Sequence, residues 1–216
     1  MTNFPPGAKR FGLLGGTFDP IHHGHLALAE AARAELELDL VLFVPARLQP
    51  HKAGCRVTAA EHRWEMVRRA VADNPGFAAC RVELDREGPS YTAETVANLT
   101  ADLPSDGQLY FICGADALLE LHTWHQPDRL LAGATVAAAA RPGAGARADL
   151  IVAAERLLRA YGGRVVLFEA PLLDISSTII RQRAAAGKPL RYLTPAGVID
   201  YIHNLCVYEK EIDQIC

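Results

Sequence analysis

Six short apolar runs recur along the chain, and stretches of helical character separate them. The runs are mostly apolar and, taken together, lack the regular alternation of polar and apolar residues that marks a strand with one solvated face. They cover residues 11–14, 40–44, 77–84, 109–113, 134–140 and 165–168. We therefore predict a doubly wound α/β fold with a mainly parallel sheet, helices on both of its faces and a small helical region at the C-terminus. Ligands in such folds bind at the carboxyl ends of the strands.

Length, composition and charge exclude several classes of protein. The 216 residues, half of them apolar, predict one globular domain over 1–216. A net charge of −3 and the lack of any Lys/Arg run argue against a nucleic-acid surface. The longest apolar stretch, 130–140, is too short to cross a membrane, and residues 1–10 have no apolar centre like that of a signal peptide. The sequence leaves a homo-oligomer open.

The cysteines indicate the redox environment. There are five of them, at positions 55, 80, 113, 206 and 216, and no C-x-x-C pair occurs. Cys80 and Cys113 fall inside predicted core strands, which favours reduced thiols in a cytoplasmic protein over disulfides.

A glycine-bearing segment joins the first apolar run to a strongly helical stretch, 26–36. It reads Gly15-Gly16-Thr17-Phe18-Asp19-Pro20-Ile21-His22-His23-Gly24-His25. A turn of this kind presents backbone N–H groups and the positive end of a helix dipole, which together bind phosphate. If the helix begins near His22 or His23, then His22 and His25 share one face of its first turn. Gly24, without a Cβ, lets a ligand approach the backbone closely.

A second phosphate site is predicted near the C-terminus, at Ile175-Ser176-Ser177-Thr178-Ile179-Ile180-Arg181. Hydroxyl groups at a helix N-terminus can donate hydrogen bonds, and an arginine one turn later can hold two phosphate oxygens at once. Together, the two sites could hold the two ends of one triphosphate.

Further helices are expected between the apolar runs. Thr58 is predicted to cap a helix that continues to about Asp73, with Glu61 in the capping-box position. Thr92 is predicted to open another helix, a third is expected over about 149–161, and a helix without obvious chemistry closes the chain. The G-x-G-x-x-G fingerprint is missing after the first run and no G-x-x-x-x-G-K-[ST] loop occurs, which disfavours a dehydrogenase or a P-loop NTPase.

At these motifs the chain resembles the nucleotidylyltransferase superfamily, whose signature (T/H)-x-G-H follows the first strand of a Rossmann-like sheet. The eleven-residue string 15–25 and the segment 175–181 resemble its bacterial nicotinate-nucleotide adenylyltransferase branch, and the similarity runs over nearly the whole chain. The resemblance implies that His22, His25 and Arg181 are catalytic. It implies an ATP site made of Gly15, Gly16, Thr17, Phe18, His22, His25, Lys52, Ser177, Thr178 and Arg181, in which Lys52 belongs to the loop Pro50-His51-Lys52.

The resemblance also implies a mononucleotide site. Its candidates are Thr92 in the segment 90–95, Gly114 and Asp116 in the segment 114–119, Trp124, His125 and Arg141. In the family, the Asp contacts a ribose and the Trp stacks on the pyridine ring; stacking suits a Trp with polar neighbours. His125 departs from the larger aromatic residue of the family pattern, and a donor there could meet the substrate carboxylate.

The implied reaction is transfer of the adenylyl group of ATP to nicotinate mononucleotide, which gives deamido-NAD and pyrophosphate. The phosphate monoester is itself the nucleophile, so positioning and charge neutralisation suffice for catalysis. Mg²⁺ is expected with ATP, held mainly by phosphates and water, because no carboxylate cluster suggests a dedicated metal site. Three alternatives stay open: another acceptor, such as nicotinamide mononucleotide or phosphopantetheine; a non-catalytic nucleotide sensor; and a metal-binding protein that uses His22, His23, His25 and His51.

Overall fold

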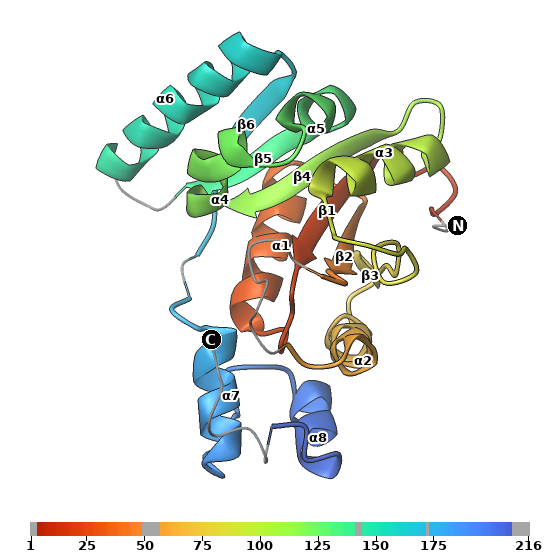
Figure 1. Cartoon of the computed structure of the whole chain (residues 1–216), viewed down its shortest axis with the longest axis vertical. Helices are drawn as coiled ribbons and strands as arrows, with labels where there is room; N and C mark the ends of the chain where they lie inside the picture. The colour runs from red at the N-terminus through yellow and green to blue at the C-terminus, as the bar shows by residue number, and fades with distance from the viewer. Residues whose placement is uncertain (1–3, 49–56, 141–143, 172, 209–216) are drawn as a thin grey trace.

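The computed structural model describes residues 4–48, 57–140, 144–171 and 173–208, and the side chains of 144–146 are left aside. Its centre is a six-stranded sheet in the order β3-β2-β1-β4-β5-β6, with all neighbouring strands parallel (Figure 1). The strands are β1 (Arg10–Gly16), β2 (Leu40–Pro45), β3 (Phe77–Ala79), β4 (Gln108–Gly114), β5 (Thr135–Ala140) and β6 (Arg164–Glu169). This confirms the predicted parallel sheet.

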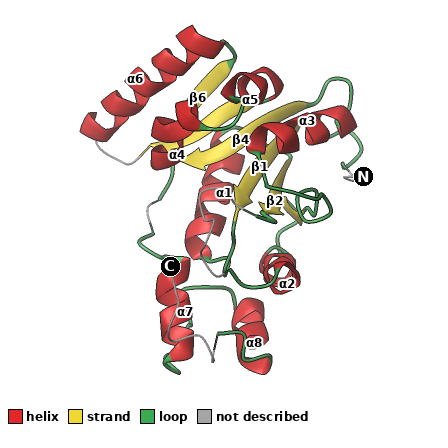
Figure 2. Ribbon diagram, viewed as in Figure 1, coloured by secondary structure: helices red, strands yellow, loops and turns green. Residues whose placement is uncertain are grey.

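Helices cover both faces of the sheet (Figure 2). Neighbouring side chains of a strand point to opposite faces, so Leu13 and Leu14 of β1 belong to two different apolar clusters. The cluster around Leu14 includes residues of α1 (His23–Glu35), α2 (Ala60–Ala70), α7 (Ser177–Ala185) and α8 (Ala196–Asn204). The cluster around Leu13 includes residues of α3 (Thr92–Asp102), α4 (Ala115–Glu120), α5 (Pro127–Gly133) and α6 (Ala144–Tyr161).

The order of the strands fixes where a ligand can bind. The chain builds β1, β2 and β3 outward in one direction, then returns to place β4 on the other side of β1. The connections that leave the carboxyl ends of β1 and β4 therefore diverge to opposite faces and leave a crevice between them. Helices α1 and α4 start directly beyond these two strand ends (Figure 1).

Two local predictions were wrong. The third strand ends at Ala79 instead of Leu84, because the chain turns at 81–85, where the N–H of Asp85 donates to the carbonyl of Arg81. Cys80 therefore follows the strand, although it is buried and its N–H donates to the carbonyl of Phe43. Thr58 does not cap α2: the N-cap is Ala59, without a side-chain hydrogen bond.

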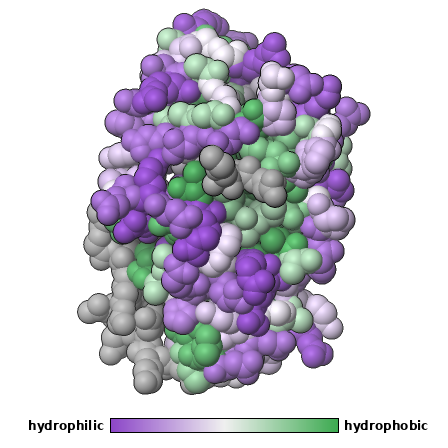
Figure 3. All heavy atoms as spheres, turned by 90° about the vertical axis from the view of Figure 1, so that its right-hand side faces the viewer, coloured by the Kyte–Doolittle hydropathy of each residue, from purple (hydrophilic) through white to green (hydrophobic). Residues whose placement is uncertain are grey.

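Three of the five cysteines lie within the described residues: Cys80 and Cys113 are buried and Cys206 is exposed. Among the described residues, no helix combines the length and the apolar character needed to span a membrane. The face seen in Figure 3 is largely hydrophilic, with a smaller apolar area near its middle.

Candidate active site

A cavity of about 590 Å³ lies beyond the carboxyl ends of β1, β4 and β5. The N-termini of α1, α4 and α7 contribute to its wall, so segments far apart in the sequence meet there. Seven of the predicted site residues line it. The lining consists of His22, Gly24, His25, Leu28, Gly114, Ala115, Asp116, Ala139, Ala170, Pro171, Leu173, Ile175, Ser176, Ser177, Thr178 and Arg181.

The two signature histidines lie at the start of α1 as the spacing predicts. His22 is the N-cap, and its imidazole stacks on that of His25 with ring centroids 3.7 Å apart. The N–H of His22 donates to Nδ1 of His25 over 3.2 Å, so a neutral His25 carries its ring proton on Nε2. A Cβ on Gly24 would lie 3.1 Å from the His22 ring, so glycine also makes room for that ring.

His22 is uncharged at neutral pH. It is 7% exposed, and this burial, together with the neighbouring His23, lowers its pKa from 6.5 to about 4. A neutral imidazole still donates one hydrogen bond to a phosphate oxygen. The positive potential at this end of the sheet therefore comes from the N-terminus of α1 and from arginine, rather than from His22.

The turn between β1 and α1, residues 17–22, is held in an unusual conformation. Phe18 has a φ of +50°, a region that non-glycine residues rarely occupy, and its side chain is 2% exposed. Its ring packs edge-on against the imidazole of His25, with centroids 5.0 Å apart. The buried ring of Phe18 therefore packs against His25 and helps to fix its position. If Phe18 contacts ATP, it does so through its backbone. Gly15, Gly16 and Thr17 end β1 and begin the turn, outside the cavity lining.

Two hydrogen bonds connect helix α7 to the β1–α1 turn. The helix begins where the sequence predicts a helix N-terminus, with Ser176 as its N-cap, which accepts from the N–H of Ile179 over 3.2 Å. The hydroxyl of Ser177 donates to the carbonyl of Pro20 at 2.8 Å, and Nη1 of Arg181 donates to the carbonyl of Asp19 at 2.8 Å. Thus Ser177 and Arg181 both line the cavity and fix the two signatures relative to each other.

The predicted mononucleotide residues fall into two groups. Gly114, the N-cap of α4, and the exposed Asp116 lie at the end of β4 and line the cavity. Thr92, Trp124 and His125 lie outside this lining. Lys52 and Arg141 are outside the described residues.

An aromatic pair joins the second group. The ring of His125 packs against that of Tyr91, the N-cap of α3, with centroids 4.2 Å apart and the planes tilted by 31°, so the structure brings together the segments 90–95 and 124–125. Trp124 is half-buried and meets Phe111 of β4 edge-on at 5.8 Å, which leaves part of the indole accessible. Thr95 is buried and donates to Glu83 at 2.6 Å, so its hydroxyl supports the segment from within. Burial raises the pKa of Glu83.

Sequence reasoning missed three buried polar residues behind the turn: Asp19, Arg63 and Tyr208. Asp19 accepts from the N–H of Thr58 at 3.0 Å and from the hydroxyl of Tyr208 at 2.9 Å. One signal was available for Arg63, because it shares the apolar face of α2 with Met66, Val67 and Ala70. A charged residue at such a position must find partners inside the protein.

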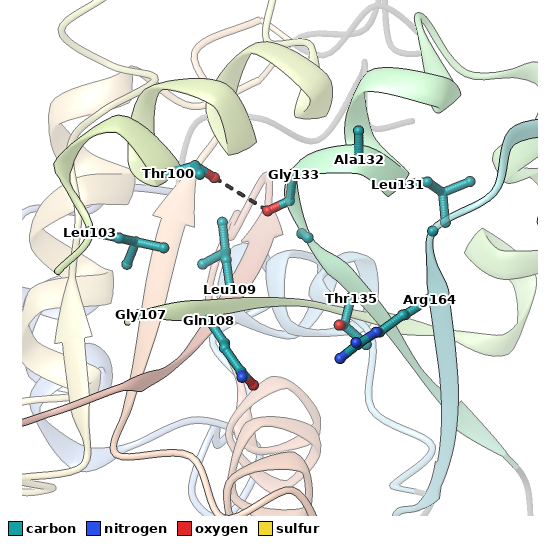
Figure 4. Close-up of a pocket in the computed structure, with 12 residues that line it drawn as sticks. Thr100, Leu103, Gly107, Gln108, Leu109, Leu131, Ala132, Gly133, Thr135 and Arg164 are labelled. Atoms are coloured by element: carbon teal, nitrogen blue, oxygen red, sulfur yellow. Dashed lines mark hydrogen bonds between the residues drawn. The ribbon is translucent and has the colours of Figure 1, made fainter. Parts of the chain in front are cut away.

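A second cavity, of about 350 Å³, lies at the amino ends of β4, β5 and β6 (Figure 4). Thr100, Gln108, Thr135 and Arg164 give it polar groups, and the hydroxyl of Thr100 donates to the carbonyl of Gly133 at 3.3 Å. Because the strands are parallel, this cavity is at the opposite edge of the sheet from the histidines. In the part of the chain that the structure describes, no three His, Cys, Asp or Glu side chains group closely enough to hold a metal ion.

Comparison with known proteins shows which family has this architecture. The model of a family described as cytidylyltransferase-like matches residues 13–183. The chain is 45% identical over 203 residues to a probable nicotinate-nucleotide adenylyltransferase of Thermoanaerobacter sp. (strain X514), covering 94% of this chain and 95% of that protein. It is 50% identical over 197 residues to the protein of the same description from Roseiflexus sp. (strain RS-1), covering 91% and 96%.

A solved structure shares the fold at low sequence identity. It is the Plasmodium falciparum nicotinic acid mononucleotide adenylyltransferase complexed with APC, with a TM-score of 0.72, 18% identity, and coverage of 95% of this chain and 100% of that one. The fold, the two signatures that meet in one cavity and the curated relatives agree. The chain therefore belongs to the cytidylyltransferase-like family and, within it, to the nicotinate-nucleotide adenylyltransferases.

Proposed function

We propose that this nucleotidyltransferase transfers the adenylyl group of ATP to nicotinate mononucleotide, a step of NAD biosynthesis. The observation that carries the proposal is the meeting of residues 19–25 and 177–181 at one cavity, fixed by the hydrogen bond from Arg181 to the carbonyl of Asp19. Two phosphate-binding helix N-termini, those of α1 and α7, then face the same volume. The relatives' names supply the acceptor.

The reaction is an in-line displacement at the α-phosphorus of ATP. A phosphate oxygen of the mononucleotide forms the new P–O bond, while the bond from the α-phosphorus to the bridging oxygen breaks and pyrophosphate leaves. A phosphate monoester is nucleophilic without a general base. What the protein supplies is alignment of the two phosphates and hydrogen-bond donors placed where charge develops.

The ring N–H groups of His22 and His25 are assigned to the ATP phosphates at the transition state. Backbone groups of Gly15, Gly16, Thr17 and Phe18, at the end of β1 and the start of the turn, are assigned to the same phosphates. Lys52, Thr178 and Arg181 are assigned to the leaving pyrophosphate, with Ser177 holding the helix start in place through Pro20. The stacked arrangement of the two imidazoles keeps both donors at a fixed spacing, which is the pre-organisation that such catalysis needs.

Mg²⁺ would neutralise charge on the triphosphate when ATP is bound. The donor set suits an ion held chiefly by the nucleotide: the described cavity lining contains one carboxylate, that of Asp116. Mg²⁺ usually retains several waters and takes few protein ligands when it accompanies a nucleotide.

The mononucleotide is assigned to the other end of the site. Asp116 at the end of β4 would accept from the ribose hydroxyls, and Arg141 would lie near the nucleotide. The accessible part of Trp124 would stack on the pyridine ring, while His125, held by Tyr91, the residue before Thr92, would offer a donor to the carboxylate. The buried free thiol of Cys113 supports the proposal that the enzyme works in the cytoplasm.

The test is pyrophosphate release with ATP and Mg²⁺, comparing nicotinate mononucleotide, nicotinamide mononucleotide and phosphopantetheine as acceptors. Turnover with nicotinate mononucleotide alone is the expected result. Equal turnover of both pyridine nucleotides would retain the chemistry and reject the selectivity for a carboxylate. Release with phosphopantetheine alone would show that Trp124 and His125 have been assigned to the wrong ligand.

A further inference from the structure

Arg63 is the largest side chain among those fully buried in the described ranges, with 2% of its surface exposed. It lies on α2 and is not one of the residues that line the cavity. Its guanidinium therefore cannot contact a nucleotide in the cavity. Burying a charge this completely is costly unless several hydrogen bonds satisfy it, so the position calls for a specific explanation.

The guanidinium holds three backbone carbonyls that belong to three different segments. Nη1 donates to the carbonyl of Thr17, where the β1–α1 turn begins, at 2.8 Å, and to the carbonyl of Ala46, directly after β2, at 2.7 Å. Nε donates to the carbonyl of Thr58, just before α2, at 2.8 Å. One rigid planar group thus sets the spacing between the ends of two neighbouring strands.

Asp19 connects the same group to the catalytic side of the turn. The N–H of Thr58 donates to Oδ2 of Asp19, while the carbonyl of Thr58 accepts from Arg63, so one residue bridges the two buried charges. Oδ1 of Asp19 accepts from the hydroxyl of Tyr208, a residue with 1% exposure. The backbone carbonyl of Asp19 accepts from Arg181, which lines the cavity.

We infer that Arg63 is a positioning residue for adenylyl transfer: through Thr17, and through Thr58 and Asp19, it sets where the β1–α1 turn holds His22 and His25 relative to Arg181. The inference rests on the proposed function. Burial lowers the pKa of Arg63, an effect that the nearby Asp19 partly offsets. Because an arginine side chain stays protonated in proteins, the guanidinium keeps all its donors. A lysine ammonium keeps the charge but lacks the planar fork that reaches three separated acceptors.

The primary test is Arg63→Lys, with Arg68→Lys as the matched control. Arg68 lies on the same helix, is exposed and holds Glu65 through two hydrogen bonds at 2.8 and 2.9 Å. Both variants are assayed for pyrophosphate release, after circular dichroism shows that they are folded at the assay temperature. We expect Arg63→Lys to lower kcat by on the order of 10²-fold with KM for ATP within threefold, since small misplacements of reacting groups cost about that much. Arg68→Lys should stay within twofold of wild type.

Each other outcome bears on the inference. A folded Arg63→Lys with wild-type kcat overturns it, and so does a variant in which only KM for ATP rises, because Arg63 would then serve ground-state binding. A wild type that releases no pyrophosphate refutes the proposed function instead, before any variant is compared.

Tyr208→Phe keeps the test decisive if Arg63→Lys does not fold. It removes one hydroxyl and leaves the ring in place, so the fold should persist while Asp19 loses a donor. We expect kcat to fall by about three- to tenfold without a change in KM. In a folded double variant, the losses should be less than multiplicative, because both residues act on the same turn. A Tyr208→Phe enzyme with unchanged kcat would contradict the inference.

Discussion

The burial of His22 has a consequence for stability that can be worked out from its pKa. The imidazole is held neutral in the folded protein, where its pKa is about 4, whereas in the unfolded chain it returns to 6.5. Below pH 6.5 the unfolded state therefore binds a proton that the folded state does not. Because ΔG of unfolding rises with pH wherever the unfolded state binds more protons, stability falls as the pH drops from 6.5 to 4.

The size of the effect follows from the two pKa values. Each unit of difference corresponds to about 1.4 kcal/mol, so the full window amounts to about 3 kcal/mol. Between pH 7 and pH 5, the share lost is about 2 kcal/mol. Natural domains typically have a free energy of unfolding of roughly 5–15 kcal/mol, so this loss is a large fraction of it. Denaturant titration readily measures a change of this size.

The measurement is urea unfolding of wild type and His22→Gln at pH 7 and pH 5. Wild type should lose about 2 kcal/mol more than the variant between the two pH values. His203→Gln, which removes an exposed histidine at the end of α8, is the matched control and should keep the wild-type pH dependence. Equal pH dependence in wild type and His22→Gln would refute the reasoning, as would an NMR titration of His22 with a midpoint near 6.5.

Four further predictions concern turnover. His25→Ala should lower kcat by about 10²–10³-fold, the scale for one charge-stabilising donor, and a variant within threefold of wild type in pyrophosphate release would contradict its assignment. Arg181→Lys keeps the charge but loses the planar donor to Asp19, so kcat should fall by about tenfold; unchanged steady-state kinetics would reject this role. Trp124→Ala should raise KM for the mononucleotide about tenfold and leave KM for ATP unchanged, since ring stacking is worth about 1–3 kcal/mol; a change in KM for ATP alone would reverse the assignment. EDTA should abolish turnover and added Mg²⁺ should restore it, whereas full activity in EDTA would exclude the expected ion.

The sheet could be predicted because each strand carries its own evidence. A run such as 109–113 has no polar face, so it must be covered on both sides, and this alone selects a parallel sheet with helices on each face. The end of the third strand could not be predicted in the same way. Val82 and Leu84 continue the apolar pattern past Ala79, and the turn that removes them from the edge strand depends on a contact between Asp85 and Arg81.

The residues of the candidate site also fall into those that local sequence patterns predict and those that depend on distant contacts. His22 and His25 could be paired from their spacing, because three residues apart on a first helical turn means one face. Asp19 could be recognised only as part of a motif, since its partners are Thr58 and Tyr208, 39 and 189 positions away. The ring contact between Tyr91 and His125 could not be predicted either, because it joins the start of α3 to the chain beyond α4. Local sequence patterns thus identify the hydrogen-bond donors of the site, whereas the contacts that fix their positions join residues far apart in the sequence.

Those long-range contacts also set when the site can exist. The β1–α1 turn is synthesised well before the residues that hold it: its carbonyls at Asp19 and Ile21 accept from Arg181 and Thr194, and the Asp19 carboxylate accepts from Tyr208. A domain generally folds as a unit during synthesis, so its native contacts require that all of its segments have emerged from the ribosome. In this protein, the nascent chain should acquire its nucleotide site only after the residues through Tyr208 have emerged.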